Sequence, residues 1–168
     1  MVIWLIGLAG AGKTSVGREL HALLRGRNPA TVFLDGDAIR RIMGDNLGHS
    51  MADREQNGWR ICRMCEYLEQ QDFDVIAAIL SNFPEQQAWN RQHFSRYFEV
   101  FLKVSENRLF ERDQKGLYSA ARAGRISNVV GVDLPFCPPR NPDLVLRNDE
   151  PRGNLRPLAE AIVAALDA

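Results

Sequence analysis

Eight residues near the N-terminus, Gly7 to Thr14, have types and a spacing that suit the binding of phosphate groups. They read Gly-Leu-Ala-Gly-Ala-Gly-Lys-Thr and match the pattern G-x-x-x-x-G-K-[ST]. Glycine lets the backbone wrap closely around phosphate oxygens, and the start of the following helix attracts anions. The Lys13 ammonium would reach the terminal phosphates of a nucleoside triphosphate, and the Thr14 hydroxyl would bind Mg²⁺. The residues expected to bind this cofactor are Gly7, Ala9, Gly10, Ala11, Gly12, Lys13, Thr14 and Ser15.

Two carboxylates form a second chemical feature. Asp35 and Asp37 flank Gly36 at the end of an apolar run. Carboxylates placed near bound phosphates order the water around Mg²⁺, and one of them can accept the proton of an attacking hydroxyl. We therefore predict Lys13, Asp35 and Asp37 as catalytic residues and Thr14 and Asp37 as metal ligands. A structural role also fits this pattern, namely an Asp-Gly turn with Asp37 capping a helix.

Basic residues follow at helical spacing and suggest a site for an anionic acceptor. Arg40 lies three residues after Asp37, and Arg54 and Asn57 lie one turn apart in a helix that Ser50 opens. Together these side chains would clamp an anion. The alternative is that Arg40 and Arg54 are solvated surface residues.

The basic segment 112–125 carries glycines at 116 and 124 that could act as hinges. A kinase must exclude water from ATP, so we predict a lid over residues 113–128. A solvated, charged helix is the alternative for this segment.

Alternating apolar runs and helical patterns predict the fold class. Strands are expected over 2–6, 31–34, 75–80, 98–104 and 144–146, and helices over 13–25, from 50 to about 71, 106–112 and 155–166. This alternation predicts an α/β protein with a P-loop NTPase fold, in which a five-stranded parallel sheet is covered by helices on both faces. We expect one domain over residues 1–168. No N-K-x-D segment is present, which argues against a GTPase, and the third strand ends without the carboxylate typical of motor ATPases.

Composition narrows the partners and the compartment. The 168 residues contain 21 Lys and Arg and 21 Asp and Glu, and this balance argues against a general nucleic-acid or membrane-surface binder. The cysteines, only three in number, fit a reducing compartment. The first apolar run is too short to span a bilayer and no positive charge precedes it, so we expect a cytoplasmic protein.

Taken together, these motifs resemble the adenylylsulfate (APS) kinase family, which includes the related cytidine diphosphoramidate kinases. The resemblance covers residues 2 to about 146, and the block Lys115-Gly116-Leu117-Tyr118 after Arg112-Asp113 is specific to the family. The other matching segments are Gly7–Thr14, Leu34–Asp37 with Arg40, Asn46-Leu47-Gly48, Asp53-Arg54 with Asn57, Ala121-Arg122, and Gly131-Val132-Asp133 with Pro135.

The resemblance implies transfer of the γ-phosphate of ATP, with Mg²⁺, to the ribose 3′-hydroxyl of a nucleotide anhydride. It also implies a small-molecule nucleotide partner and a homodimer. In the family, the counterpart of Asp37 is the base or the organiser of Mg²⁺. The residues that it places around the acceptor are Asp37, Arg40, His49, Arg54, Asn57, Ser81, Lys115, Leu117, Arg122 and Val129.

The sequence departs from the family pattern at residues that recognise the base of the acceptor. His49 and Val129 stand where the family has two Phe residues that stack on adenine, and Ser81-Asn82-Phe83-Pro84 replaces Ser-Pro-Tyr-Arg. Stacking contributes about 1–3 kcal/mol per base, so the adenine clamp is expected to be weaker or replaced. We expect adenylylsulfate as the first acceptor and cytidine diphosphoramidate as the alternative. A nucleotide-binding regulator without catalysis is the third hypothesis.

Overall fold

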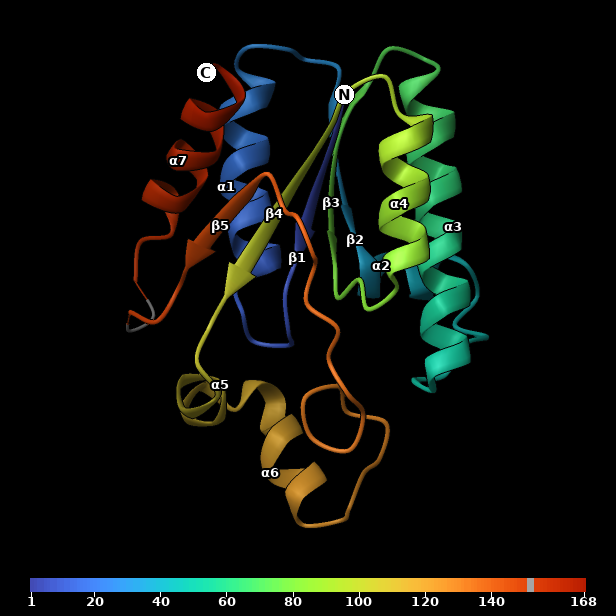
Figure 1. The fold of residues 1–168 in the computed structure, drawn as a ribbon, viewed down its shortest axis with the longest axis vertical. Helices are drawn as coiled ribbons and strands as arrows, with labels where there is room; N and C mark the ends of the chain where they lie inside the picture. The colour runs from blue at the N-terminus through green and yellow to red at the C-terminus, as the bar shows by residue number, and fades with distance from the viewer. Residues whose placement is uncertain (151–152) are drawn as a thin grey trace.

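A five-stranded parallel sheet forms the centre of the protein. The computed structural model describes residues 1–150 and 153–168, the side chain of Gln114 excepted. The strands are ordered β2-β3-β1-β4-β5 across the sheet, which confirms the expected architecture (Figure 1). Their bounds are β1 Val2–Ile6, β2 Thr31–Asp35, β3 Asp74–Ile79, β4 Tyr97–Lys103 and β5 Leu144–Arg147.

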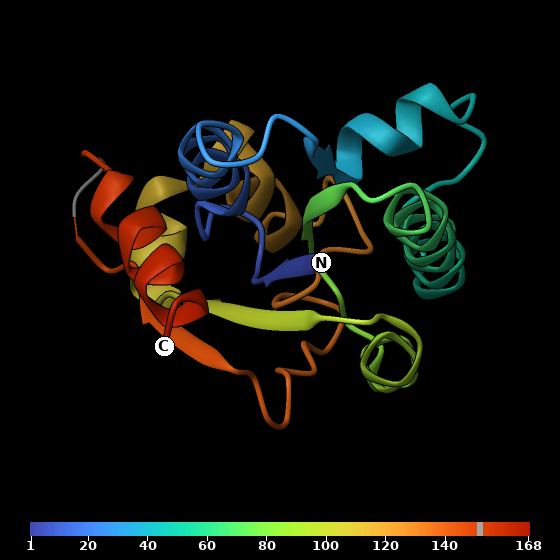
Figure 2. The ribbon, with the colours of Figure 1, turned by 90° about the horizontal axis from the view of Figure 1, so that it is seen from above.

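Helices cover both faces of this sheet. On one face α1 packs against α7, and on the other α3 packs against α4, so that the two pairs lie on opposite sides (Figure 2). A further pair, α5 and α6, lies beyond the carboxyl ends of the strands (Figure 1). The helices are α1 Lys13–Arg25, α2 Gly36–Ile42, α3 Met51–Glu69, α4 Pro84–His93, α5 Glu106–Arg112, the 3-10 turn η1 Gln114–Gly116, α6 Leu117–Arg122 and α7 Arg156–Leu166.

Strand β1 explains why the sequence shows a continuous apolar run at its start. All five of its residues are fully buried, because side chains alternate between two covered faces. Ile3 and Leu5 join the core under α1 and α7, while Val2, Trp4 and Ile6 join the core under α3 and α4. The strand therefore fixes the phosphate loop, which follows it directly, at the centre of the sheet edge.

Helix α4 was not among the helices expected from the sequence. Its inward residues Gln86, Gln87 and Asn90 are polar although they are buried, so the helix lacks the apolar period by which a buried face is recognised. Pro84 at its first turn is a favourable start. Within the described part of the chain, no helix has the length and apolarity needed to cross a membrane.

Candidate functional site

The phosphate loop begins where β1 ends and has a backbone that requires glycine. Gly10 and Gly12 adopt φ values of 78° and 96°, in the left-handed region that side chains disfavour. A Cβ on Gly12 would also lie 2.6 Å from Nδ2 of Asn148. Helix α1 starts immediately after Gly12, and its first turn receives no side-chain cap from the described residues. Its first amides are thus available to an anion.

Three side chains from distant segments, together with Lys13 of the loop itself, fix the carbonyl side of this loop. The carbonyls of four consecutive residues, from Leu8 to Ala11, each accept a hydrogen bond from a side chain. The donors, in order, are Lys13 Nζ (2.9 Å), Tyr118 OH (2.7 Å), Arg112 Nη1 (3.2 Å) and Asn148 Nδ2 (2.9 Å). The loop is therefore shaped before any ligand binds, as a preorganised anion site requires.

Lys13 supplies the positive charge of this loop. Burial lowers the pKa of its ammonium to about 8, and the carboxylates of Asp37 and Asp35 oppose that shift, with Asp37 the stronger of the two. A buried cation gains most when a polyanion binds beside it, because the anion offsets the cost of desolvating the ammonium. These properties of Lys13 and of the loop suit the binding of the phosphates of a nucleoside triphosphate.

The two carboxylates at the end of β2 have different environments. Oδ1 of Asp35 caps α2 by accepting hydrogen bonds from the amides of Asp37 and Ala38, both at 3.1 Å. Its Oδ2 accepts a hydrogen bond from the Thr14 hydroxyl at 2.6 Å. Asp37 is exposed, and its carboxylate acts on the charges of Lys13, Arg54 and His49. The helix cap considered for Asp37 is thus formed by Asp35 instead.

A cleft bounded by α2, α3 and the residues after β3 receives the predicted acceptor side chains. The structure brings together Asp37, Arg40, Arg54, Asn57 and Ser81 along its walls. Asn82, Phe83 and Gln86, which were not predicted as site residues, also line it. The cleft lies on the Asp37 side of the phosphate loop. A second pocket, which includes part of the loop itself, is lined by Gly10, Gly12, Ser15, Glu19, Arg112, Asn148 and residues 153–155.

The two arginines of the cleft are held by backbone carbonyls. Arg40 is only 7% exposed, and its Nη1 donates to the carbonyls of Leu47 at 3.3 Å and Gly48 at 2.5 Å. Arg54 donates from Nε to the His49 carbonyl at 2.9 Å and from Nη2 to the Asn128 carbonyl at 2.8 Å. Burial and the neighbouring Arg40 lower the pKa of Arg54. The solvated alternative is therefore wrong for Arg40, which is buried, whereas Arg54 is half-buried. Two cations held this close together favour an anion.

Several buried polar atoms of residues that line the cleft lack a hydrogen-bond partner among the described residues. Among the described residues, Arg40 Nε, Asn57 Oδ1 and Gln86 Oε1 have no hydrogen bond, although each is inaccessible to solvent. An unpaired buried polar atom typically costs about 1–3 kcal/mol, so native proteins rarely leave several together without a ligand or water to satisfy them. Arg40, Asn57 and Gln86 all line the cleft, where a ligand or water could satisfy such atoms.

The segment expected to be a lid contacts the phosphate loop. Asp113 and Lys115 adopt positive φ values of 28° and 59°, and the Asp113 carboxylate accepts hydrogen bonds from the first amides of α6. Lys115 is exposed, whereas Arg122 stacks over the Phe110 ring, its guanidinium carbon 3.3 Å from the centroid. Tyr118 belongs to the family-specific block but was not predicted as a site residue; its hydroxyl reaches the loop from α6.

The positions that replace the two aromatic residues of the family differ in exposure. His49 is exposed overall, but partial desolvation of its ring and the charges of nearby Arg54 and Arg40 lower the pKa of its imidazole. Val129 is 4% exposed and packs with Leu109 and Tyr118, as Leu117 does from α6. Val129 therefore forms part of a small core under the lid segment and offers no open face for stacking.

Comparison with known proteins places this geometry in a family. The model of the adenylylsulphate kinase family matches residues 1–147, and the chain belongs to this family of P-loop kinases, which phosphorylate a hydroxyl acceptor. The solved structure of the Mycobacterium tuberculosis APS kinase CysC in complex with AMPPNP and APS superposes with a TM-score of 0.90. It is 33% identical, and the match covers 99% of this chain and 97% of that one.

The names of two similar curated proteins state different acceptors. A cytidine diphosphoramidate kinase from Campylobacter jejuni is 38% identical over 98% of this chain and 95% of its own length. An adenylyl-sulfate kinase from Halothermothrix orenii is 35% identical over 89% of this chain and 81% of its own. A shikimate kinase from Aquifex aeolicus, at 17% identity and a TM-score of 0.62, shares the fold.

Proposed function

We propose that this protein transfers the γ-phosphate of ATP to the ribose 3′-hydroxyl of a nucleotide anhydride, with adenylylsulfate as the first acceptor. The observation that carries the proposal is the placement of Asp37 between two sites. Asp37 lines the acceptor cleft with Arg40 and Arg54, and its carboxylate also offsets part of the lowering of the Lys13 pKa at the phosphate loop. A hydroxyl bound in the cleft would thus meet the terminal phosphate beside a carboxylate that can take its proton.

In this reaction the acceptor oxygen forms a bond to the γ-phosphorus, and the bond from that phosphorus to the β–γ bridging oxygen breaks. ADP leaves with the electron pair, and Asp37 takes the hydroxyl proton or orients the groups that do. Lys13 and the loop amides stabilise the charge that develops on the phosphate oxygens. Thr14, Asp35 and Asp37 supply the hydroxyl and carboxylate oxygens that Mg²⁺ prefers, and the ion would offset phosphate charge. The ATP nucleoside would occupy the second pocket, beside Arg112.

Cytidine diphosphoramidate is a second candidate acceptor, and a specific observation favours it. The aromatic pair that stacks on adenine in the family is replaced by exposed His49 and buried Val129. The relative named for cytidine diphosphoramidate also matches nearly the full length of this chain. Both acceptors have a ribose 3′-hydroxyl, so the same phosphate chemistry would serve either one.

The acceptor assay tests this proposal directly. The purified protein is incubated with Mg-ATP and either adenylylsulfate or cytidine diphosphoramidate, and ADP formation is followed. We expect acceptor-dependent ADP with at least one of the two, and the ratio of kcat/KM values identifies the acceptor. ATP binding without acceptor-dependent turnover would support the regulator hypothesis instead.

Three expectations from the sequence belong to this proposal. The chain acts as a single kinase domain with a lid over residues 113–128, as a homodimer, and in the cytoplasm. Light scattering on the purified protein measures the oligomeric state. A mass close to the 19.0 kDa of one chain would contradict the dimer.

A further inference from the structure

Asn82 is a buried polar residue at the edge of the acceptor cleft. It lies between β3 and α4, is 2% exposed, and stands where the family pattern has Pro. A proline side chain has no polar atom, whereas the amide of Asn82 has both a donor and an acceptor. Any hydrogen bond of this side chain is therefore one that the family pattern does not provide.

Both ends of this amide bind the backbone of the loop that leads to β5. Nδ2 donates to the Pro135 carbonyl at 2.9 Å, and Oδ1 accepts a hydrogen bond from the Cys137 amide at 2.7 Å. Nδ2 also makes a longer and weaker contact, at 3.9 Å, with Sδ of Met51 at the start of α3. Because a carbonyl can only accept and a backbone amide can only donate, these partners fix the orientation of the side chain. Asn82 therefore fastens the backbone of residues 135–137 to the edge of the cleft.

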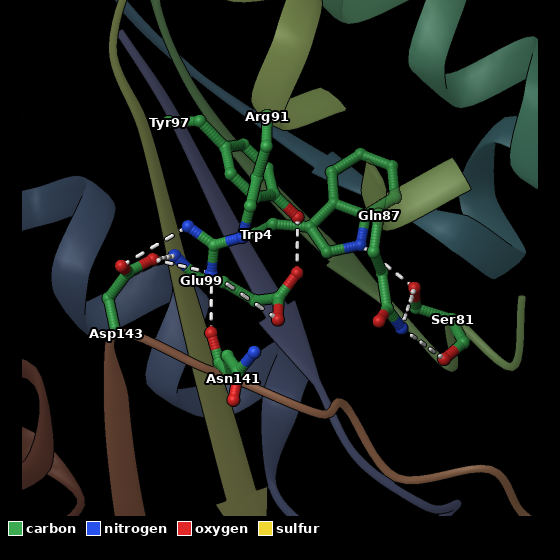
Figure 3. A network of polar contacts seen from close by, with 8 residues as sticks. All are labelled: Trp4, Ser81, Gln87, Arg91, Tyr97, Glu99, Asn141 and Asp143. Atoms are coloured by element: carbon green, nitrogen blue, oxygen red, sulfur yellow. Dashed lines mark hydrogen bonds and ion pairs between the residues drawn. The ribbon is translucent and has the colours of Figure 1, made fainter. Parts of the chain in front are cut away.

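The backbone from which Asn82 projects is itself anchored to the core. The indole Nε1 of Trp4, in the central strand, donates to Ser81 Oγ at 3.0 Å (Figure 3). Nε2 of Gln87, in the first turns of α4, donates to the Ser81 carbonyl at 3.3 Å (Figure 3). The residue before Asn82 is thus held from the sheet and from the helix, so the contacts of Asn82 start from a fixed point.

The loop that Asn82 fastens also holds Arg54. Within residues 128–137, the Asp133 carboxylate accepts hydrogen bonds from the amides of Asn128 at 2.6 Å and Val129 at 2.7 Å. Further backbone hydrogen bonds close the turn between these residues. The Asn128 carbonyl in turn accepts a hydrogen bond from Nη2 of Arg54 at 2.8 Å. A continuous set of hydrogen bonds therefore leads from the edge of the cleft, through this segment, to the arginine.

We propose that Asn82 is a positioning residue for acceptor binding: it holds the 128–137 segment in place, and this segment holds the Arg54 guanidinium in the cleft. Both side chains line the cleft, and each binds the segment near one of its ends. If the segment moves, Arg54 loses a carbonyl partner and the orientation that suits an anionic acceptor. The inference rests on the proposed kinase function and adds to it a residue by which this chain departs from the family pattern. Asn82 acts on the acceptor through Arg54.

The first test removes one of these hydrogen bonds without changing a residue of the cleft. Cys137 is exposed, and Cys137→Pro deletes the amide hydrogen that Asn82 accepts, whereas Cys137→Ala keeps it. We expect Cys137→Pro to raise the acceptor KM by about three- to tenfold, as the loss of one ordinary hydrogen bond would, with the KM for ATP unchanged. Cys137→Ala should leave both KM values unchanged. Equal KM values for the two variants would overturn the inference.

The second test is a double-mutant cycle on Asn82→Leu and Arg54→Met. Asn82→Leu keeps a side chain of similar volume but removes both hydrogen bonds to the loop, so the acceptor KM should again rise by about three- to tenfold. The double variant should match Arg54→Met alone, because Asn82 acts through that guanidinium. Effects that multiply would show that Asn82 acts independently of Arg54 and would overturn the inference.

Hydrogen exchange tests the contact with the loop without an activity assay. In the unchanged protein the Cys137 amide should be protected, and Asn82→Leu should speed its exchange by about tenfold or more, while the amides of β1 keep their protection. If the exchange of the Cys137 amide did not change, Asn82 would not hold the segment. Absence of acceptor-dependent ADP formation by the unchanged protein would instead refute the kinase function itself, whatever the exchange experiment shows.

Discussion

The phosphate loop and the acceptor cleft share one edge of the sheet, but they differ in how completely the protein alone satisfies them. At the loop, four consecutive carbonyls are held by side chains from three other segments and from the loop's own lysine. In the cleft, three buried polar atoms have no partner among the described residues. The comparison indicates that side chains hold the carbonyls of the loop in place, whereas the cleft has buried polar atoms that a ligand or water could satisfy.

The largest effect is expected at the loop. Lys13→Ala removes the charge that stabilises the transferred phosphate, so kcat should fall by about 10³-fold or more. Steady-state ADP formation measures it. Lys103→Ala removes an exposed lysine at the end of β4 and should leave kcat unchanged. A Lys13→Ala variant with nearly full kcat would show that the loop does not act on the reacting phosphate.

Asp37→Asn tests the residue shared by the two sites. The change keeps the shape of the side chain but removes its charge and most of its basicity, so we expect kcat to fall by about 10²–10³-fold. Titration calorimetry should still detect ATP binding. Asp45→Asn, in the exposed loop after α2, is the matched control. If kcat fell no more than in the control, Asp37 would have no catalytic role.

Arg54→Met should act on the acceptor side only. It removes two hydrogen bonds to backbone carbonyls and a cation of the cleft, so the acceptor KM should rise by about 10- to 100-fold. The KM for ATP should change little. Arg41→Met, an exposed arginine of α2, serves as the control. If the KM for ATP rose by the same factor, the two sites would not be separable in the way the structure suggests.

The lowered pKa of Lys13 predicts how ATP affinity depends on pH. The ammonium is charged below its pKa of about 8 and neutral above it. The Kd of Mg-ATP should therefore be constant below pH 7 and rise above pH 8, by up to about tenfold per pH unit. Calorimetry across pH 6.5–9.5 measures this, and Lys13→Arg, which stays charged, should flatten the profile. A flat profile for the unchanged protein would show that Lys13 keeps its charge in the free loop.

The smallest effect concerns the lost aromatic pair. Val129→Phe adds volume to a closed core around Leu109 and Tyr118, so unfolding in urea should require about 1–3 kcal/mol less free energy. His49→Phe changes an exposed residue and should leave stability within about 0.5 kcal/mol. If Val129→Phe were neutral and tightened adenylylsulfate binding, the core would open to form a stacking surface.

The two sites also differ in how far the sequence predicts them. The loop is contiguous in sequence, and its glycines, lysine and threonine together form a known phosphate-binding motif. The function of Gly7 to Thr14 could therefore be predicted from the sequence. The strands could be predicted for a similar reason, because a strand buried on both faces is a continuous apolar run. Asp35 was recognised as a site residue, but its roles as helix cap and as partner of Thr14 depend on geometry across 21 residues.

The residues that support the site were not predictable from the sequence. Trp4 and Ser81 are 77 residues apart, and Asn148 lies 137 residues from the carbonyl that it binds. Helix α4 buries glutamines and an asparagine, which a search for apolar periodicity treats as a surface. Buried polar side chains are selected by their partners in the folded protein, and those partners become neighbours only when the sheet has formed.

The position of the transferred phosphate tests the central claim most directly. Phosphorus NMR of a reaction with Mg-ATP and the preferred acceptor, at complete turnover, distinguishes a new ribose phosphomonoester from free phosphate. Transfer across Asp37 from loop to cleft predicts one 3′-phosphomonoester for each ADP formed. Release of inorganic phosphate at the same rate with and without acceptor would contradict it.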